Sequence, residues 1–514
     1  MFPFYLIKLC KHRGIYFANS LFRPIFRRNF AYGSLESTIY ALATGGVRSA
    51  VAVVRVSGPK SQQVLQEIGQ FRQFPLPRVA TVKRLYDISG GSLIDHAMVL
   101  WFPGPKSYTG EDSCEFHVHG GPAVIHALLR NIGSFKGCRM AEPGEFTKRA
   151  FLNGKMDLTE VDGLGDLISS ETEMQRVQAL NQMTGSLGKL YESWRNDIAK
   201  CLADVEAFID FGEDENIEDN ILENVHGRLE FLLKIMKTHL RDSRKGERLR
   251  TGVTVAILGK PNVGKSSLLN ILCRQEAAIV SDIPGTTRDV LRATINVNGY
   301  PVLLADTAGL RYDPADIIET EGIRRALKEA QSADIIVLLV DLNDPKLTCV
   351  STERQLLIQE EIMGPLNWNE DMLSLVEERT LIVGNKLDLD RNKQLAVRED
   401  LFNAMISCKT SEGFDQFLSK LSEQVSTLCA DPKSEEAYIT HERYRSHLEN
   451  CVLHLEEYLQ ESRKWSSRPQ DCNIDFALQS VPLKNAMNSI GCITGHFGTE
   501  DILDIIFRDF CIGK

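Results

Sequence analysis

Residues 253–266 read VTVAILGKPNVGKS, and this stretch decides the fold of the middle of the chain. Val253–Leu258 is an apolar, β-branched run that predicts a buried strand, and the pattern G-x-x-x-x-G-K-S follows it at Gly259–Ser266. The glycines let backbone N–H groups curl around phosphates, and the helix that begins next adds the positive end of its dipole. We therefore predict a phosphate-binding loop in which Lys265 reaches the β- and γ-phosphates and Ser266 binds Mg²⁺.

Four more motifs follow in an order typical of GTPases. Thr286–Thr287 can close over the nucleotide, and Asp306–Gly309 (DTAG) ends an apolar run where a carboxylate can hold Mg²⁺ through water. Asn385–Asp388 (NKLD) ends another such run, and Ser407–Lys409 (SCK) is placed to back the base. The carboxylate of Asp388 can accept two N–H bonds from guanine, which adenine cannot supply in the same geometry. These motifs predict a site for GTP.

Composition fits a folded protein of several domains, with one unusual end. The chain has 514 residues, which predicts three to four domains, and its formal net charge is −10, so indiscriminate binding to nucleic acid is disfavoured. Residues 1–35 carry six Lys or Arg and no acid, the pattern of a mitochondrial targeting peptide; a secretory signal and a disordered basic arm are the alternatives. Removal of this segment would lower the charge from −10 to −16. No apolar run is long enough to span a membrane.

The remainder divides by its periodicity. Residues 36–153 show short β-rich runs with Gly-rich loops, which predicts an α+β domain. Residues 154–250 and 429–514 have helical spacing, and 251–428 alternates strands and helices, the signature of a parallel α/β sheet. The economical arrangement is one helical domain split by an inserted α/β domain of the Ras-like P-loop type.

Cysteine and histidine give no clear metal motif. The 12 cysteines include no C-x-x-C pair, so we expect isolated thiols in a reducing compartment. His117 and His119 would share one face of a strand, either as ordinary strand residues or as half of a metal site with no evident third ligand.

Residues 251–428 resemble the translation-factor-related GTPases, and the whole chain beyond residue 35 resembles the MnmE (TrmE) family of tRNA-modifying GTPases. The motifs that carry the second resemblance are GGVRSAVAVVRVSG at 45–58, LWFPGPKSYTGEDSCEFHVHGGP at 100–122, EPGEFTKRAFLNGKMDL at 142–158 and FCIGK at 510–514. With its basic start, the chain is most similar to mitochondrial members.

The resemblance implies a function in the mitochondrial matrix. Family members work with a FAD-binding partner of the MnmG type on carbon 5 of the wobble uridine of certain tRNAs. In mitochondria the product is of the carboxymethylaminomethyl or taurinomethyl type, and 5,10-methylenetetrahydrofolate or a formyl-tetrahydrofolate analogue is the implied folate. The N-terminal domain is expected to bind it and to form a homodimer. The family's folate-contacting positions match Arg55, Glu115, Lys155 and Lys514, although surface charges and a strand-face residue are the ordinary alternatives.

The resemblance also implies how GTP is hydrolysed. Leu310 stands where Ras-type proteins carry a water-positioning Gln, and no arginine finger is evident, with Arg288 and Arg311 as the candidates. In similar GTPases K⁺ supplies that positive charge, which here gives Asn262, Ser281, Ile283 and Thr286 as K⁺ ligands. Mg²⁺ would be held by Ser266 and Thr287.

Two ways of counting place the water-orienting carboxylate at different residues. Counted back from Gly322-Ile323, it is Glu319; counted forward from Asp306, the position falls on Ile318, which has no suitable group, and Glu321 is the fallback. The expected catalytic residues are therefore Glu319, Thr287 and Lys265. The expected GTP-binding residues are Asn262, Val263, Gly264, Lys265, Ser266, Ser267, Ser281, Thr286, Thr287, Asp306, Thr307, Ala308, Gly309, Asn385, Lys386, Asp388, Ser407, Cys408 and Lys409.

Two questions stay open at this point. Cys511 is either a nucleophile assisted by Lys514 or part of a tail that simply plugs into the N-terminal domain. A mitochondrial ribosome-assembly GTPase, or a folate-dependent transferase or scaffold with a decayed nucleotide site, would be the rival functions. The acidic body disfavours the first, and intact Lys265, Ser266, Asp306 and Asp388 disfavour the second.

Overall fold

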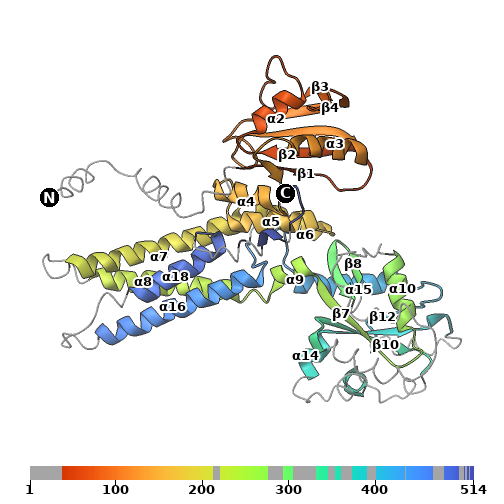
Figure 1. Cartoon of the computed structure of the whole chain (residues 1–514). Helices are drawn as coiled ribbons and strands as arrows, with labels where there is room; N and C mark the ends of the chain where they lie inside the picture. Colours follow the sequence, from red (N-terminus) through yellow and green to blue (C-terminus); the bar gives the residue numbers. More distant parts are fainter. Residues whose placement is uncertain are drawn as a thin grey trace, which may run out of the picture. The chain divides into compact units, whose positions relative to one another are not determined.

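The structure is a computed structural model and describes residues 37–211, 220–275, 293–304, 331–344, 354–360, 373–389, 401–434, 436–466, 480–496, 503, 506–508 and 510–514. It divides into two compact units (Figure 1). Unit 1 comprises the chain up to Met156 and the segment from Thr499 to Lys514, and unit 2 comprises Asp157–Gly498. The second helical block was expected to run to residue 514, whereas the structure groups its last residues with the N-terminal unit.

Unit 1 is an α+β unit built on a six-stranded sheet of order β3-β4-β5-β2-β1-β6. Its pairs are antiparallel except β1 with β6. The strands are β1 (Thr38–Leu42), β2 (Ser49–Ser57), β3 (Thr81–Tyr86), β4 (Leu93–Phe102), β5 (Ser113–Gly120) and β6 (Cys138–Met140). The helices are α2 (Ser61–Ile68), α3 (Pro122–Gly133) and α4 (Glu145–Leu152).

Alternation along the strands gives this sheet two different faces. Val54 and Val56 of β2 and Phe116 of β5 are fully buried in the core that α2 and α3 cover. Arg55 and Glu115 alternate with them and therefore lie on the opposite face. A separate small core forms on β1 and α4 from Ile39, Ala41, Ala141 and Phe146.

Unit 2 contains a helical part and an α/β part. The helical part consists of α5 (Leu158–Ser169), α6 (Glu173–Met183), α7 (Ser186–Phe211), α8 (Asn220–Leu240), α16 (Glu442–Ser466) and α18 (Val481–Thr494). α7, α8, α16 and α18 pack side by side (Figure 1) and share one apolar core, so helices from both ends of the sequence build one body. The helical period expected over Glu171–Ile209 is interrupted after Met183, where Gly185 has a φ of 79°.

The α/β part of unit 2 has the sheet order β12-β11-β10-β7-β9-β8. The described pairs are parallel except β8 with β9. Its strands are β7 (Val253–Leu258), β8 (Ala293–Val297), β9 (Tyr300–Leu304), β10 (Ile335–Asp341), β11 (Thr380–Asn385) and β12 (Ala404–Met405). The helices are α9 (Lys245–Thr251), α10 (Lys265–Gln275), α12 (Arg354–Ile358), α14 (Leu373–Glu378) and α15 (Phe414–Leu428), with a 3₁₀ turn at Leu387–Leu389.

The expected α+β and helical architecture is confirmed. Strands β7, β10 and β11 are almost wholly buried, as expected for parallel strands covered on both faces. Within the described residues, no helix combines the length and the apolar character needed to cross a membrane.

Arg149 holds α4 to the sheet of unit 1 through an ionic network that is hidden from water. Its guanidinium contacts Glu145 at 3.0 Å and Glu111 at 3.1 Å, and it also donates to the Ser37 carbonyl oxygen at 2.8 Å. The Arg149 side chain is only 3% exposed. Removing it would leave the half-buried Glu111 carboxylate without its cation and the buried Glu145 with Arg139 alone, which is costly.

We predict that Arg149→Met lowers the unfolding free energy of unit 1 by about 3 kcal/mol. The measurement is native-state hydrogen exchange of peptides from β2 and β5 in the full chain. Arg176→Met is the matched control, because Arg176 pairs with Glu173 on the surface of unit 2; its effect should stay within about 0.5 kcal/mol. Equal protection of β2 and β5 in wild type and Arg149→Met would contradict the prediction.

Candidate functional site

The phosphate-binding loop has the geometry that its sequence predicts. It joins the carboxyl end of β7 to α10, and backbone φ is positive at three of its residues: 145° at Gly259, 63° at Asn262 and 105° at Gly264. The Lys265 ammonium donates to the carbonyl oxygens of Gly259 and Lys260, both at 2.8 Å. Ser266 and Ser267 are exposed in the first turn of α10, so the hydroxyl of Ser266 is accessible to a ligand or metal.

Asn385 joins this loop to the guanine motif. Its side chain is buried, and Nδ2 donates to the Val263 carbonyl oxygen at 2.7 Å. Its Oδ1 accepts the backbone N–H of Cys408 at 3.1 Å. The sequence motifs at 259–266, 385–388 and 407–409 therefore meet at one place, as expected from the aligned carboxyl ends of β7, β10 and β11.

Asp388 is held in position by Ser407. The Ser407 hydroxyl donates to Asp388 Oδ1 at 2.7 Å and accepts the Thr410 N–H at 3.1 Å. Asp388 itself is exposed, so its other oxygen remains accessible for a ligand. Burial raises the pKa of the Cys408 thiol to about 11, which keeps it neutral, and Cys408 packs against the core of the α/β part as a small apolar residue.

Asp341 is a candidate site residue that the sequence reasoning missed. It ends β10 opposite Asn385, and its Oδ2 accepts a hydrogen bond from the Lys386 ammonium at 2.6 Å. Burial opposes ionisation of Asp341, but bonds from Lys386 and Asn343 outweigh it and lower the pKa. The signal was present as a single carboxylate at the end of the apolar run Ile335–Asp341. Next to it, Lys260 of the phosphate loop pairs with Asp344 at 2.9 Å.

Several predicted residues lie outside the described residues. This group comprises Ser281, Ile283, Thr286, Thr287, Arg288, Asp306, Thr307, Ala308, Gly309, Leu310, Arg311, Ile318, Glu319 and Glu321. Of the expected K⁺ ligands only Asn262 is described, and of the expected Mg²⁺ ligands only Ser266.

A second cluster lies in unit 1, on the face of the sheet opposite α2 and α3. Arg55 and Glu115 are direct neighbours on β2 and β5, and Arg55 Nε donates to Glu115 Oε1 at 3.0 Å. The other carboxylate oxygen of Glu115 lies 3.3 Å from His117 Nε2. The Arg55 guanidinium carbon lies 5.0 Å from the centroid of the Tyr108 ring and 5.7 Å from that of Phe146.

The Arg55 guanidinium has one hydrogen-bond donor that is not used. Arg55 Nη1 is shielded from solvent and has no hydrogen-bond partner among the described residues. A buried donor without an acceptor costs free energy, so this atom favours a ligand that supplies one.

The C-terminal tail docks beside this cluster. Phe146 N donates to the Lys514 carbonyl oxygen at 3.2 Å, and Gly513 is buried with a φ of 95°. A Cβ at Gly513 would come within 2.3 Å of the Leu42 carbonyl oxygen, so only glycine fits. Burial, and then the nearby Arg55 guanidinium, lower the pKa of Lys514, although Cys511 and Glu115 oppose this.

The other residues of unit 1 that the sequence singled out make no bond to Arg55 or Glu115 that the structure describes. Lys155 is exposed, and its ammonium donates to the Pro105 carbonyl oxygen at 3.1 Å rather than to the Arg55 cluster. Cys511 is exposed at the start of the docked tail. His119 is 71% exposed and bonds to Asp95, and within the described residues no group of three or more His, Cys, Asp or Glu could hold a metal ion.

The fold and the nucleotide site define a protein of the guanine-nucleotide-binding P-loop class. Two family models match the chain: the MnmE helical domain over residues 158–511 and the GTP-binding protein TrmE N-terminus over residues 38–155. The chain therefore belongs to the MnmE (TrmE) family of tRNA-modifying GTPases, and it is a GTP hydrolase of that family.

Curated relatives match over almost the entire chain. The mitochondrial 5-taurinomethyluridine-tRNA synthase subunit GTPB3 is 45% identical in Danio rerio and 44% identical in Homo sapiens, and each alignment covers 93% of this chain and 93% of the relative. The tRNA modification GTPase MnmE of Parvibaculum lavamentivorans is 43% identical, with 93% of this chain and 100% of the relative covered.

We predict that Ser407→Ala weakens GTP binding about fivefold, because Asp388 loses the hydroxyl that orients it. Inosine triphosphate lacks the 2-amino group that the carboxylate reads, so its affinity should fall less. Calorimetric titration with both nucleotides measures the ratio. Lys420→Ala is the control, since Lys420 pairs with Glu423 on the surface of α15 and the Ser407–Asp388 bond stays intact. An unchanged preference for GTP over inosine triphosphate in Ser407→Ala would contradict the orienting role.

Proposed function

We propose that this chain is a K⁺-dependent GTPase that works in mitochondria on carbon 5 of the wobble uridine of tRNA. Its partner would be a FAD-binding subunit of the MnmG type, and the product would be of the taurinomethyl or carboxymethylaminomethyl type. The names of the mitochondrial relatives and the acid-free basic segment at residues 1–35 support this location, and we infer the matrix.

The observation that carries the proposal is the Arg55–Glu115–Lys514 cluster in unit 1. A folate presents a pterin with amide-like donors and acceptors and a tail with carboxylates. The unpaired Arg55 Nη1 and the Glu115 carboxylate are complementary to such a molecule, and Lys514 adds a cation beside them. The residues present therefore fit a tetrahydrofolate, which would supply the one-carbon unit when bound. Lys155, which follows α4, would join only after its ammonium leaves the Pro105 carbonyl oxygen.

The nucleotide half of the proposal rests on the joined motifs of the α/β part, which we propose is an inserted Ras-like GTPase domain spanning residues 251–428. Gly259–Ser266 would hold the phosphates and Asp388 the guanine, with Ser266 and Thr287 on Mg²⁺. Asn262 would bind K⁺ together with Ser281, Ile283 and Thr286, and Glu319 would orient the attacking water. Positioning and electrostatics then supply the rate enhancement.

The charge of the chain is compatible with a shared tRNA site. Without residues 1–35 the formal net charge is −16, so this chain alone is a poor non-specific binder of RNA. We propose that the flavin partner holds most of the tRNA, and that unit 1 also forms the homodimer.

Deletion of the gene tests the proposal directly. Mass spectrometry of nucleosides from mitochondrial tRNA should show the wobble uridine without its carbon 5 substituent. Re-expression of wild type or of Arg84→Met, a surface change on β3, should restore it, whereas Arg55→Met should not. An unchanged wobble uridine after deletion would exclude the function, and rescue by Arg55→Met would exclude the folate site.

A second prediction concerns K⁺. GTP hydrolysis should be much faster in KCl than in NaCl of equal ionic strength, and Asn262→Gly should lose this difference. Glycine is the informative substitution because Asn262 has a φ of 63°, which glycine adopts without strain, so the loop backbone is kept. GTP affinity, measured in parallel, should stay near the wild-type value. K⁺ activation that survives in Asn262→Gly would mean that the Asn is present for its backbone conformation alone.

A further inference from the structure

The helical part and the α/β part of unit 2 have separate apolar cores, and the chain crosses between the two parts twice. Leu249 and Ala430 belong to the core of the α/β part, whereas Met236 and Ile439 belong to the core of the helical part. The entering crossing therefore lies within residues 237–249 and the returning crossing within 430–439. Residues in and next to these crossings determine how the GTPase part is held to the helical body.

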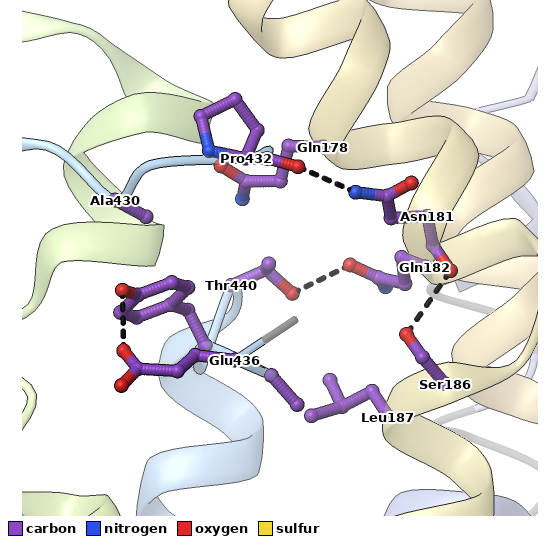
Figure 2. A pocket seen from close by; sticks show the side chains of 11 residues that line it. Gln178, Asn181, Gln182, Ser186, Leu187, Ala430, Pro432, Glu436 and Thr440 are labelled. Carbon is purple, nitrogen blue, oxygen red and sulfur yellow. Dashed lines mark hydrogen bonds between the residues drawn. The ribbon is translucent and has the colours of Figure 1, made fainter. Parts of the chain in front are cut away.

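Helix α6 bonds to both crossings through four amide side chains. Gln175 Nε2 donates to the Arg250 carbonyl oxygen at 2.8 Å, and Gln178 Nε2 donates to that of Gly246 at 3.0 Å, both in α9. On the return path, Asn181 Nδ2 donates to the Pro432 carbonyl oxygen at 2.7 Å, and Gln182 Oε1 accepts the Thr440 hydroxyl at 2.8 Å. Figure 2 shows the last two bonds, with Gln178 beside them.

The four amides lie along one side of α6, because residues three, four and seven apart share a helix face. Arg176 and Leu180 alternate with them and are exposed. The first turn of α6 also reaches the sheet itself, since Met174 N donates to the carbonyl oxygen of Gly299 in the β8–β9 turn at 3.1 Å. Only Ala179 and Gln182 of this helix are buried, so α6 is not held by an apolar stripe.

Asp166 of α5 reinforces the same arrangement. Its Oδ1 accepts from Arg250 Nε at 2.7 Å, and its Oδ2 lies 3.0 Å from His441 Nε2. Arg250 directly follows the entering crossing and His441 lies just beyond the returning crossing. The single carboxylate of Asp166 therefore links the chain at both crossings. Burial opposes ionisation of Asp166, but His441 and Arg250 outweigh it and lower the pKa.

This polar contact zone has space beside it. A cavity of about 270 Å³ is lined by Asp166, Gln175, Gln178 and Arg250, among others, and a smaller one of about 40 Å³ lies between α6 and the returning segment (Figure 2). Gln178 Oε1 is shielded and has no partner within the described part of the chain. Directional amide bonds with water-sized space nearby can change partners at low net cost, whereas an apolar core cannot slide so readily.

We infer that Gln175, Gln178, Asn181 and Gln182 are positioning residues, which set the orientation of the GTPase part on the helical body and carry its nucleotide-dependent movement to that body. Their side-chain bonds named above go to α9, Pro432 and Thr440, and none reaches the described nucleotide motifs at 259–266, 385–388 and 407–409, so their loss should uncouple hydrolysis from tRNA modification rather than stop hydrolysis. The link to modification rests on the proposed function, whereas the orientation itself does not.

The test uses Gln175→Met/Gln178→Met in the full chain with its partner, since Met preserves side-chain length and helix propensity but cannot donate to α9. Arg176→Met, on the exposed side of α6, is the matched control. Energy transfer between dyes at the exposed positions Ser426 of α15 and Asn450 of α16 reports orientation with GDP and with a non-hydrolysable GTP analogue. GTP turnover and wobble-uridine modification are measured on the same samples.

In wild type and Arg176→Met the dye distance should differ between the two nucleotides. In the double variant the distance distribution should broaden and lose this difference, modification should fall about tenfold, and GTP turnover should stay within about twofold. If the double variant unfolds, Gln178→Met alone is tested by the same criteria. Parallel loss of GTP turnover, or a wild-type nucleotide response in the variant, would overturn the inference. Absence of modification in wild type as well would instead contradict the proposed function.

Discussion

The nucleotide site depends on one buried amide, that of Asn385. It is the point at which the phosphate loop, the guanine motif and the base-backing segment are joined, because its two polar atoms bond to Val263 and Cys408. An aspartate at this position could not donate to the Val263 carbonyl oxygen. A leucine could neither donate to Val263 nor accept from the Cys408 N–H. The Asn385 side chain also packs tightly against the backbone of the phosphate loop, since a Cβ on Gly264 would lie 2.3 Å from Asn385 Nδ2. Asparagine at 385 therefore requires glycine at 264, whose φ of 105° also favours glycine.

Cations in both sites are held by carboxylates in a chain that is acidic overall. Arg55 pairs with Glu115, Lys386 with Asp341 and Lys260 with Asp344, while Lys265 bonds to loop carbonyl oxygens. An anionic ligand at Lys260 or Lys265 must exchange with these internal acceptors, so binding reorganises the loop instead of merely filling it. Arg55 is the exception. Its Nη1 has no hydrogen-bond partner among the described residues, so a ligand can bind there without displacing an internal acceptor.

Much of this arrangement is readable from sequence because it is periodic or local. The phosphate loop, NKLD and SCK each end a strand, and parallel strands bring such ends together, so their meeting at Asn385 follows from the pattern. Arg55 and Glu115 came only from resemblance, since the register that makes them neighbours joins residues 60 apart. Lys155 shows the limit of assigning residues by resemblance, because its ammonium bonds to the Pro105 carbonyl oxygen and not to the Arg55 cluster. The α6 amides were not recognised, because Gln and Asn at helical spacing look like an ordinary solvated face until the crossings cover them.

Asn262 illustrates how one residue type can meet two requirements. The loop turns through positive φ at Gly259, Asn262 and Gly264, a type of backbone path that in phosphate-binding loops lets N–H groups converge on an anion. Asparagine is the non-glycine residue that tolerates this conformation best, so the backbone alone accounts for its presence. Its side chain is nevertheless exposed at the rim of the loop, where an amide oxygen is also a suitable ligand for K⁺. The conformational requirement explains why the residue is small and polar, and a metal-binding role would add a function to a side chain that the fold already demands.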